Sequence, residues 1–288
     1  MSKYKKVIIA IVIAFFLVPT LMFSGSRYFL NRGVELMDES PEEARNHFRT
    51  AADINPLSGK GHAYKALSYH DGATLSSFIH REEVENVIEN YEKAASRLFT
   101  EAWAYQNLGF IYYQRSRQLS DKKKYAEKSI NNLEKANSME KSAKNYHYIG
   151  NLNLYIYDDV ESAESYFKQG VENFPQDVSN FIGLVSAYVK DGDCEDAKRY
   201  FETAMDFNKE RMERSEYDSF VADGYFKIGL CHVEGNNIYV RGLDYFLKAY
   251  EADSEHLGSL LYLVKTYNFL GAEETANWYE ERLSNLDI

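Results

Sequence analysis

The feature that most constrains the fold of this chain is a repeated alternation of small and large residues. Ala197, Phe201 and Ala204 follow one another at intervals of four and three residues, which places them on one face of a helix. Small residues let a second helix approach, the ring fills the adjacent gap, and a following proline stops the helix because it lacks an N–H group. The same pattern, now completed by a proline, recurs at Ala44, Phe48, Ala51 and Pro56, and at Ala163, Phe167, Gly170 and Pro175. It predicts packed pairs of helices.

The preceding helix of each pair has its own signature, and equivalent positions recur at intervals of about 35 residues or more, close to the period of a helix-turn-helix solenoid. Examples are Tyr105, Leu108, Gly109 and Tyr112, and Tyr225, Ile228 and Gly229. On these residues the chain resembles the tetratricopeptide repeat (TPR) family. The match is strongest over Phe181, Leu184, Tyr188, Gly192, Ala197, Phe201 and Ala204, over Tyr146, Ile149, Gly150, Ala163, Phe167, Gly170 and Pro175, and over Leu263, Tyr267, Gly271 and Ala276.

The resemblance implies an all-α, right-handed helix-turn-helix solenoid over residues 27–288. We expect seven helix pairs, at 27–54, 58–98, 101–138, 142–174, 177–208, 217–252 and 256–286. The first pair is the least regular, because residues 28–36 also fit a continuation of the helix before it. Only four prolines but 24 tyrosines suit such a fold, in which flat amphipathic rings do much of the packing.

The N-terminus is different in kind. MSKYKK is followed by 17 residues without a charge, VIIAIVIAFFLVPTLMF, and then by Ser24, Gly25 and Ser26. A helix of that length spans roughly 25 Å, near the lower limit for crossing a bilayer, and the lysines favour a cytoplasmic N-terminus. Residues 1–26 are therefore predicted to be a single-pass signal anchor, with the repeats on the periplasmic face of a bacterial inner membrane. The alternative is a signal peptide cleaved after Ser26, which releases a secreted or periplasmic protein.

Neither composition nor motifs indicate catalysis. The net charge is −11 and the first 26 residues contain lysines but no acid, so the remainder is more acidic still and nucleic acid is excluded as a partner. The chain has no HExxH, GxSxG or CxxC motif. His70, Asp71 and His80 bracket an insertion in the second pair without a fixed spacing, so no metal site is expected there. We expect a non-enzyme without cofactor or metal.

The resemblance also implies that the first helix of each pair lines a concave groove, in which a helix or extended peptide of a protein partner lies. Asn151 suits one position of the carboxylate clamp known in the family, but Ile182 and Asp223 replace the next Asn and Lys, so that clamp is absent. We expect groove aromatics such as Trp103 and Tyr148, rather than outer acids such as Glu161 and Glu164, to carry binding. The groove register gives Trp103, Asn107, Phe110, Tyr113, His147, Tyr148, Asn151, Tyr155, Phe226, Lys227, Leu230, Leu261, Tyr262, Lys265 and Phe269.

The two cysteines occupy related positions. Cys194 begins a second helix and Cys231 falls near the end of the next first helix, so both lie on one rim of the predicted solenoid. Export allows oxidation, and the alternatives are a disulfide or two separate thiols. Taken together, the sequence predicts a non-catalytic scaffold or adaptor in a cell-envelope assembly. The alternative is a soluble periplasmic repeat protein that binds peptide or polysaccharide.

Overall fold

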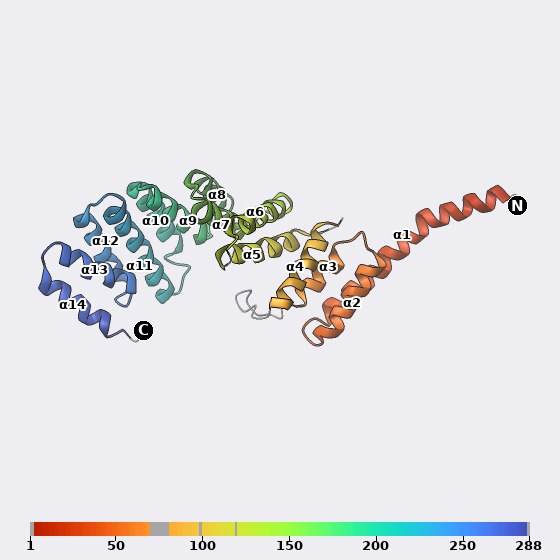
Figure 1. The fold of residues 1–288 in the computed structure, drawn as a ribbon, viewed down its shortest axis with the longest axis horizontal. Helices are drawn as coiled ribbons and strands as arrows, with labels where there is room; N and C mark the ends of the chain where they lie inside the picture. The colour runs from red at the N-terminus through yellow and green to blue at the C-terminus, as the bar shows by residue number, and fades with distance from the viewer. Residues whose placement is uncertain (1–2, 70–80, 98–99, 119, 287–288) are drawn as a thin grey trace. The chain divides into compact units, whose positions relative to one another are not determined.

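The structure is a computed structural model that describes residues 3–69, 81–97, 100–118 and 120–286; the side chains of 3–17 and 81–83 lie outside this description. Every described element is helical, and each predicted pair corresponds to two consecutive α-helices (Figure 1). The pairs are α1 (Lys3–Glu35) with α2 (Pro41–Ile54), α3 (Lys60–Leu67) with α4 (Arg81–Ala95), α5 (Ala102–Gln118) with α6 (Lys122–Met139), α7 (Ala143–Leu152) with α8 (Val160–Asn173), α9 (Val178–Asp191) with α10 (Cys194–Asn208), α11 (Arg214–Leu230) with α12 (Tyr239–Ala252), and α13 (Leu257–Phe269) with α14 (Glu273–Ser284). We call the first helix of a pair helix A and the second helix B.

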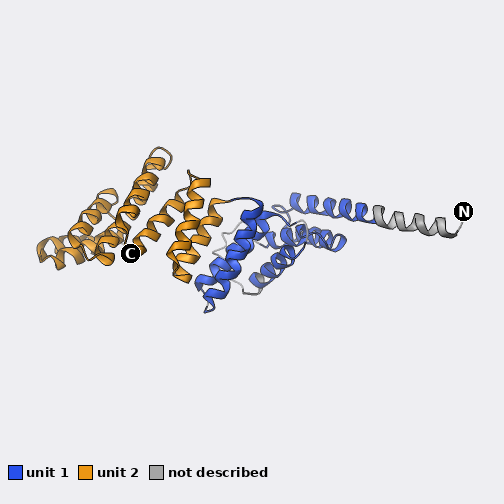
Figure 2. Ribbon diagram, turned by 90° about the horizontal axis from the view of Figure 1, so that it is seen from above, with its two compact units in different colours: residues 1–141 blue, residues 142–288 orange. Residues whose placement is uncertain are grey.

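The chain divides into two compact units, residues 1–141 and 142–288, which are coloured separately in Figure 2. Unit 1 contains α1 to α6, with a core that includes Tyr91, Leu108 and Tyr112. Unit 2 contains α7 to α14. Its core has two clusters of buried side chains, one that includes Phe167 and Phe201 and one that includes Phe246 and Leu263. In each unit the buried rings and aliphatic side chains come from the apolar faces of the A and B helices.

The small-and-large pattern has a direct structural explanation. The ring of Phe167 on α8 is fully buried between glycines of two A helices. A Cβ atom on Gly150 of α7 would lie 2.4 Å from this ring, and one on Gly183 of α9 would lie 2.3 Å from it. Since real Cβ atoms do not approach so closely, glycine is required at both positions. The same fit of a B-helix phenylalanine against an A-helix glycine recurs at Phe48 and Gly33, Phe201 and Gly224, and Phe246 and Gly229.

Local capping sets where several helices begin and end. Asp159, Asp177 and Asp193 each precede a helix and accept a hydrogen bond from a backbone N–H of its first turn, at 2.9 to 3.0 Å. An aspartate there also complements the positive end of the helix dipole. At the other end of α9, Gly192 adopts a φ of 81°, a left-handed conformation that terminates the helix at low cost only for glycine. The acidic runs of the sequence are therefore in part capping elements.

Helix α1 joins the predicted anchor segment to the first repeat without interruption. It runs from Lys3 to Glu35 with Pro19 inside it. Ser26 is buried, and its hydroxyl donates to the carbonyl oxygen of Ala51 on α2 at 2.9 Å, so packing against the repeat already begins at the boundary predicted for the anchor. Within the described residues, no helix combines the length and apolar character needed to cross a membrane. Most of the apolar run 7–23 belongs to the residues whose side chains lie outside the description.

Two A helices end in a π-helical turn. Residues Asn153–Tyr157 follow α7 and Cys231–Gly235 follow α11, forming η2 and η3. The wider turn rotates the side chains that follow relative to an ordinary α-helix, and such turns are frequent at functional positions. Here they carry Tyr155, which is exposed, and Cys231, which is buried. The sequence pattern did not indicate either turn.

Three histidines, His232 buried and His62 and His147 partly buried, make stability depend on pH. Burial lowers the pKa of His62, His147 and His232 below the ordinary value of 6.5, and the Nδ1 atom of each has no hydrogen-bond partner within the described residues. Because the unfolded chain binds these protons at a higher pH than the folded chain does, the stabilisation is present above pH 6.5 and is lost as the pH falls below it.

We therefore expect the melting temperature to decrease as the pH is lowered from 7.5 to 5.5. Each histidine contributes at most about 1.4 kcal/mol per pH unit. The substitution His147→Gln removes one titrating group and should flatten this dependence, as measured by thermal unfolding across the range. Asn151→Ala serves as the control, since it removes the polar side chain 2.9 Å from His147 but no titrating group. Equal pH slopes in the wild type and His147→Gln would contradict the assignment.

Candidate functional site

The A helices of unit 2 form a continuous wall. Consecutive A helices contact one another, α7 with α9, α9 with α11, and α11 with α13. One side of each helix packs into the core, while the opposite side carries residues that are partly or fully exposed. We call this row of side chains the inner wall; it consists of Tyr148, Asn151, Tyr155, Ile182, Ser186, Asp223, Lys227, Leu261 and Lys265.

Polar contacts between neighbouring A helices hold the inner wall together. Lys227 on α11 donates from its Nζ to the Oγ of Ser186 on α9 at 3.1 Å. The Nε2 of His256, the residue before α13, lies 3.1 Å from Oδ1 of Asp223 on α11, and this contact lowers the pKa of the Asp223 carboxyl. Each contact joins one repeat to the next, so the spacing of side chains along the wall is fixed before any partner binds.

Sequence reasoning missed the contribution of α9 to this wall. Ser186 stands 35 residues after Asn151 and Lys190 stands 35 residues after Tyr155, so the repeat register places them at equivalent positions. The Nζ of Lys190 donates to the carbonyl oxygen of Leu154 at 3.0 Å, which joins α9 to η2. Applying the 35-residue period to the predicted groove would have found both residues.

The predicted groove residues of unit 2 differ in accessibility. Tyr155, Leu261 and Phe269 expose 61%, 40% and 63% of their surface, so they are available to a partner. Phe226 and Leu230 instead pack against the core around Phe246. His147, which lies beside Asn151, and Tyr148 are both partly exposed.

Tyr262 belongs to a small polar group at one end of the wall. It donates a hydrogen bond to a carboxylate oxygen of Glu234, and this bond is the main cause that raises the pKa of Tyr262 to about 12. The ammonium group of Lys265 lies 4.5 Å from the centre of the Tyr262 ring, a distance suited to a cation–π contact. Tyr262 therefore remains a neutral donor at physiological pH and helps to position Lys265.

The four groove residues predicted in unit 1 are less accessible than the sequence suggested. Trp103 packs against the core beside Tyr64 and Tyr91, with ring centres 5.1 and 6.4 Å away, and its indole N–H donates to Glu101 at 2.7 Å. Replacing Trp103 would therefore cost stability as well as any contact with a partner. Of the others, Asn107 donates to the Tyr91 hydroxyl, Tyr113 is buried, and Phe110 stacks on Tyr113.

The acidic outer face is also not uniform. Glu161 is exposed at the start of α8. Glu164, one turn further on, accepts a hydrogen bond from the Tyr188 hydroxyl at 2.6 Å and pairs with Lys168, and these contacts lower the pKa of its carboxyl. Glu164 thus links α8 to α9 structurally. Of these two glutamates, only Glu161 can be substituted as a control for partner binding without removing such a contact.

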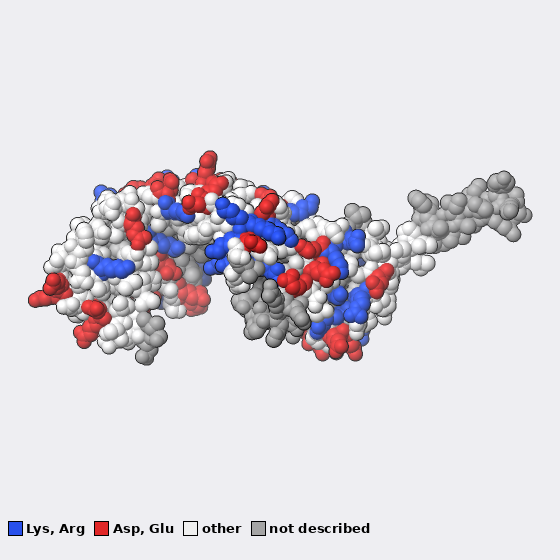
Figure 3. Space-filling model, in the orientation of Figure 1, with Lys and Arg blue, Asp and Glu red and all other residues white. Residues whose placement is uncertain are grey.

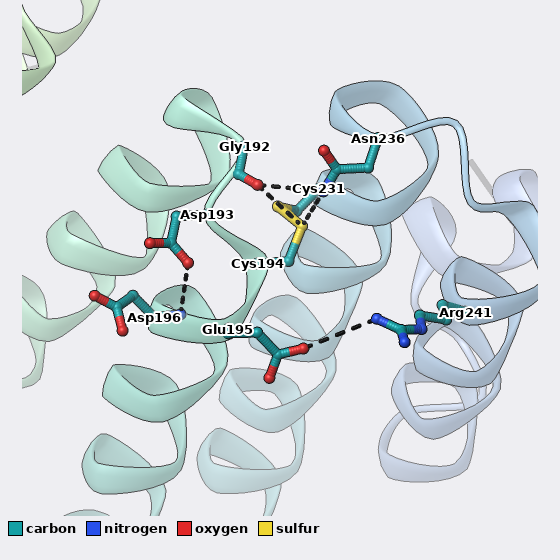
Figure 4. A network of polar contacts seen from close by, with 8 residues as sticks. All are labelled: Gly192, Asp193, Cys194, Glu195, Asp196, Cys231, Asn236 and Arg241. Carbon is teal, nitrogen blue, oxygen red and sulfur yellow. Dashed lines mark hydrogen bonds and ion pairs between the residues drawn. A yellow bond between two sulfur atoms is a disulfide. The ribbon is translucent and has the colours of Figure 1, made fainter.

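A disulfide joins Cys194 and Cys231 on the rim of unit 2 (Figure 4). The Cα atoms are 5.7 Å apart, and the bond ties the first residue of α10 to the first residue of η3. The side-chain amide of Asn236 donates to the Gly192 carbonyl oxygen at 3.2 Å and contacts the Cys194 sulfur at 3.1 Å. Beside it, Glu195 and Arg241 approach to 4.0 Å. Both cysteines are buried, so the bond is shielded by its surroundings.

Comparisons with known proteins identify the fold class. No protein-family model matches the sequence. No curated protein matches it either. Solved structures, by contrast, match over most of the chain, and several are described as TPR proteins. The chain therefore has the fold of helical repeat proteins of the TPR type.

Three of these structures illustrate the similarity. The C-terminal part of a TPR repeat-containing protein from Cytophaga hutchinsonii aligns with a TM-score of 0.64 at 13% identity, covering 90% of this chain and 95% of that one. PilF of Pseudomonas aeruginosa aligns with a TM-score of 0.54 at 15% identity, covering 85% and 99%. YrrB, described as a TPR protein with an unusual peptide-binding site, aligns with a TM-score of 0.54 at 18% identity, covering 74% and 95%.

Proposed function

We propose that this chain is a non-catalytic scaffold, anchored in a membrane by its N-terminal helix, that holds a protein partner on the inner wall of unit 2. The observation that carries the proposal is the wall itself, a row of partly exposed side chains on consecutive A helices whose spacing is fixed by contacts between repeats. A preformed surface binds with a small ordering cost, which suits recognition of a helix or an extended segment. The similarity to YrrB is consistent with peptide recognition.

The charges of the wall specify the partner further. Lys265 is exposed and Lys227 is partly exposed, and neither forms an ion pair within the described residues. Tyr155 and Leu261 supply exposed apolar surface on the same row. We infer a partner segment in which acidic residues alternate with large apolar ones, so that carboxylates meet the lysines and an apolar side chain covers Leu261.

Two features support a location outside the cytoplasm. The 17 uncharged residues after MSKYKK suit a signal anchor, and a disulfide persists in oxidising compartments. Attachment to a membrane raises the effective concentration of the scaffold for partners in the same membrane. The second candidate, a soluble periplasmic protein that binds peptide or polysaccharide after cleavage at Ser26, is distinguished by sequencing the mature N-terminus.

Site-specific cross-linking in intact cells tests the wall. A photoreactive residue placed at Tyr155 or Leu261 should give a discrete adduct with a partner, whereas one placed at the exposed Glu202 on α10 should give none. We expect Lys227→Glu combined with Leu261→Asp to abolish the adduct formed at Tyr155, because each central contact is worth about 2 kcal/mol. Glu161→Lys is the matched control and should leave the adduct unchanged. Adducts at Glu202 but not at Tyr155 or Leu261 would place the binding face on the B helices instead.

A further inference from the structure

A cavity of 470 Å³ opens beside α1 in unit 1. Helix α1 contributes one face of it, the turn before α3 contributes Asn55 and Ser58, and α3 contributes Lys60 and Tyr64. Among the described residues, the lining includes two cationic side chains and no carboxylate, whereas the chain as a whole is acidic. The α1 residues that line it are Phe23, Ser26, Arg27, Leu30, Asn31 and Val34.

Polar groups in this cavity have unused binding capacity. Asn55 is only 7% exposed, yet its side-chain amide forms no hydrogen bond to any described residue. The Asn55 side chain lines the cavity, so its amide can form hydrogen bonds with a ligand that fills it. Arg27 forms no ion pair within the described part of the chain, whereas Lys60 pairs with Glu101. The free positive charge of the cavity is therefore that of Arg27, with the Asn55 amide and the Ser58 hydroxyl nearby.

The cavity lies directly beyond the apolar run. Arg27 follows Phe23, the last residue of that run, by four positions, or about 6 Å along a continuous helix. The polar headgroup region on each side of a bilayer is roughly 5–8 Å thick. Leu21 and Phe23 are exposed on the same helix, and Figure 3 shows this stretch of α1, next to the grey residues, without charged side chains. If the run lies in the hydrocarbon, Arg27 is at the depth of lipid phosphates.

We propose that this cavity binds the phosphodiester headgroup of an anionic phospholipid from the membrane that holds α1. The proposal rests on the membrane anchoring put forward above. Arg27 pairs with the phosphate, and the Asn55 amide and Ser58 hydroxyl donate to its oxygens. Phe23, which lines the cavity on the membrane side of Arg27, contacts the glycerol and the first carbons of the acyl chains, while Leu30 and Val34 line the part of the cavity further from the membrane. Such a bound lipid fixes the orientation of the first repeat relative to the membrane surface, because α1 is both the membrane anchor and the first helix of that repeat.

Native mass spectrometry of the full-length protein in detergent tests this proposal with phosphatidylglycerol and phosphatidylcholine at equal concentration. We expect the wild type to retain phosphatidylglycerol about tenfold more than phosphatidylcholine, equivalent to about 1.4 kcal/mol. Arg27→Gln should remove the preference. Asn31→Asp should remove it as well, because a carboxylate one turn from Arg27 neutralises its charge. Arg32→Gln is the matched control, since Arg32 lies on the same helix, pairs with Glu35 and does not line the cavity.

The outcomes separate this proposal from the anchoring on which it rests. A chain that does not float with vesicles of either lipid overturns both. A chain that floats with both and shows no phosphatidylglycerol preference, or a preference that Arg27→Gln leaves intact, overturns the lipid site alone. Equally tight, Arg27-dependent binding of soluble glycerol phosphate or of a glutamate-rich peptide would assign the cavity to a soluble ligand instead. Thermal melting of Arg27→Gln, expected to match that of Arg32→Gln, excludes unfolding as the cause.

Discussion

Replacing Phe167 by alanine is expected to lower the free energy of unfolding of this protein by about 3–5 kcal/mol, the usual cost of deleting a fully buried aromatic ring. The ring fills the space between Gly150 on α7 and Gly183 on α9, and neither glycine has a side chain that could move into the vacancy. The cavity would therefore remain open. This cavity would weaken the contacts of α8 with both α7 and α9. It would therefore also weaken the coupling between two successive repeats.

Urea unfolding followed by circular dichroism measures this effect, with two comparisons. Phe167→Leu fills part of the space and should cost less than the alanine variant. Phe269→Ala removes the same ring from an exposed position and should cost under about 1 kcal/mol. If the alanine variants at positions 167 and 269 were equally stable, the fit of the B-helix ring against A-helix glycines would not be the source of stability.

Loss of the Cys194–Cys231 bond should have the second largest effect. The bond links two residues that are 37 positions apart in the sequence. Without the bond the unfolded chain gains conformational entropy, which lowers the free energy of unfolding. For a loop of this length we expect a loss of about 2–4 kcal/mol. The double variant Cys194→Ser with Cys231→Ser should melt at a lower temperature than the oxidised wild type, and reductant should lower the wild type towards the variant.

The double variant is also the control for this experiment, since reductant should not change its melting temperature. Thiol counting in the denatured protein provides an independent measurement. The wild type should show two reactive thiols with reductant and none without it. Two thiols under both conditions would mean that the bond does not form in the isolated protein, and the support that it gives to an oxidising location would be withdrawn.

The groove residues show which aspects of side-chain exposure can be predicted from the sequence and which cannot. Tyr155 and Leu261 are exposed where the repeat register expects them. Trp103 and Phe226 have equally suitable positions in the sequence but pack against their cores. The difference depends on neighbours far away in the sequence, such as Tyr64 beside Trp103 and Phe246 beside Phe226, whose rings lie 5.1 and 5.9 Å away. A periodic pattern identifies the face of a helix but does not show how deeply each ring on it is inserted.

The amino-acid sequence by itself determined the succession of helix pairs, because spacings such as Ala163, Phe167 and Gly170 act within one helix and repeat along the chain. Only the tertiary structure decided that α1 continues into the first repeat, that Asn55 faces a cavity beside Arg27, and that the two cysteines come within bonding distance. The irregular segment KERMERSE lies between these cysteines, so their separation is set by how α11 packs on α9 and α10. Local spacing specifies helices, whereas contacts between distant segments depend on packing that no single stretch of sequence encodes.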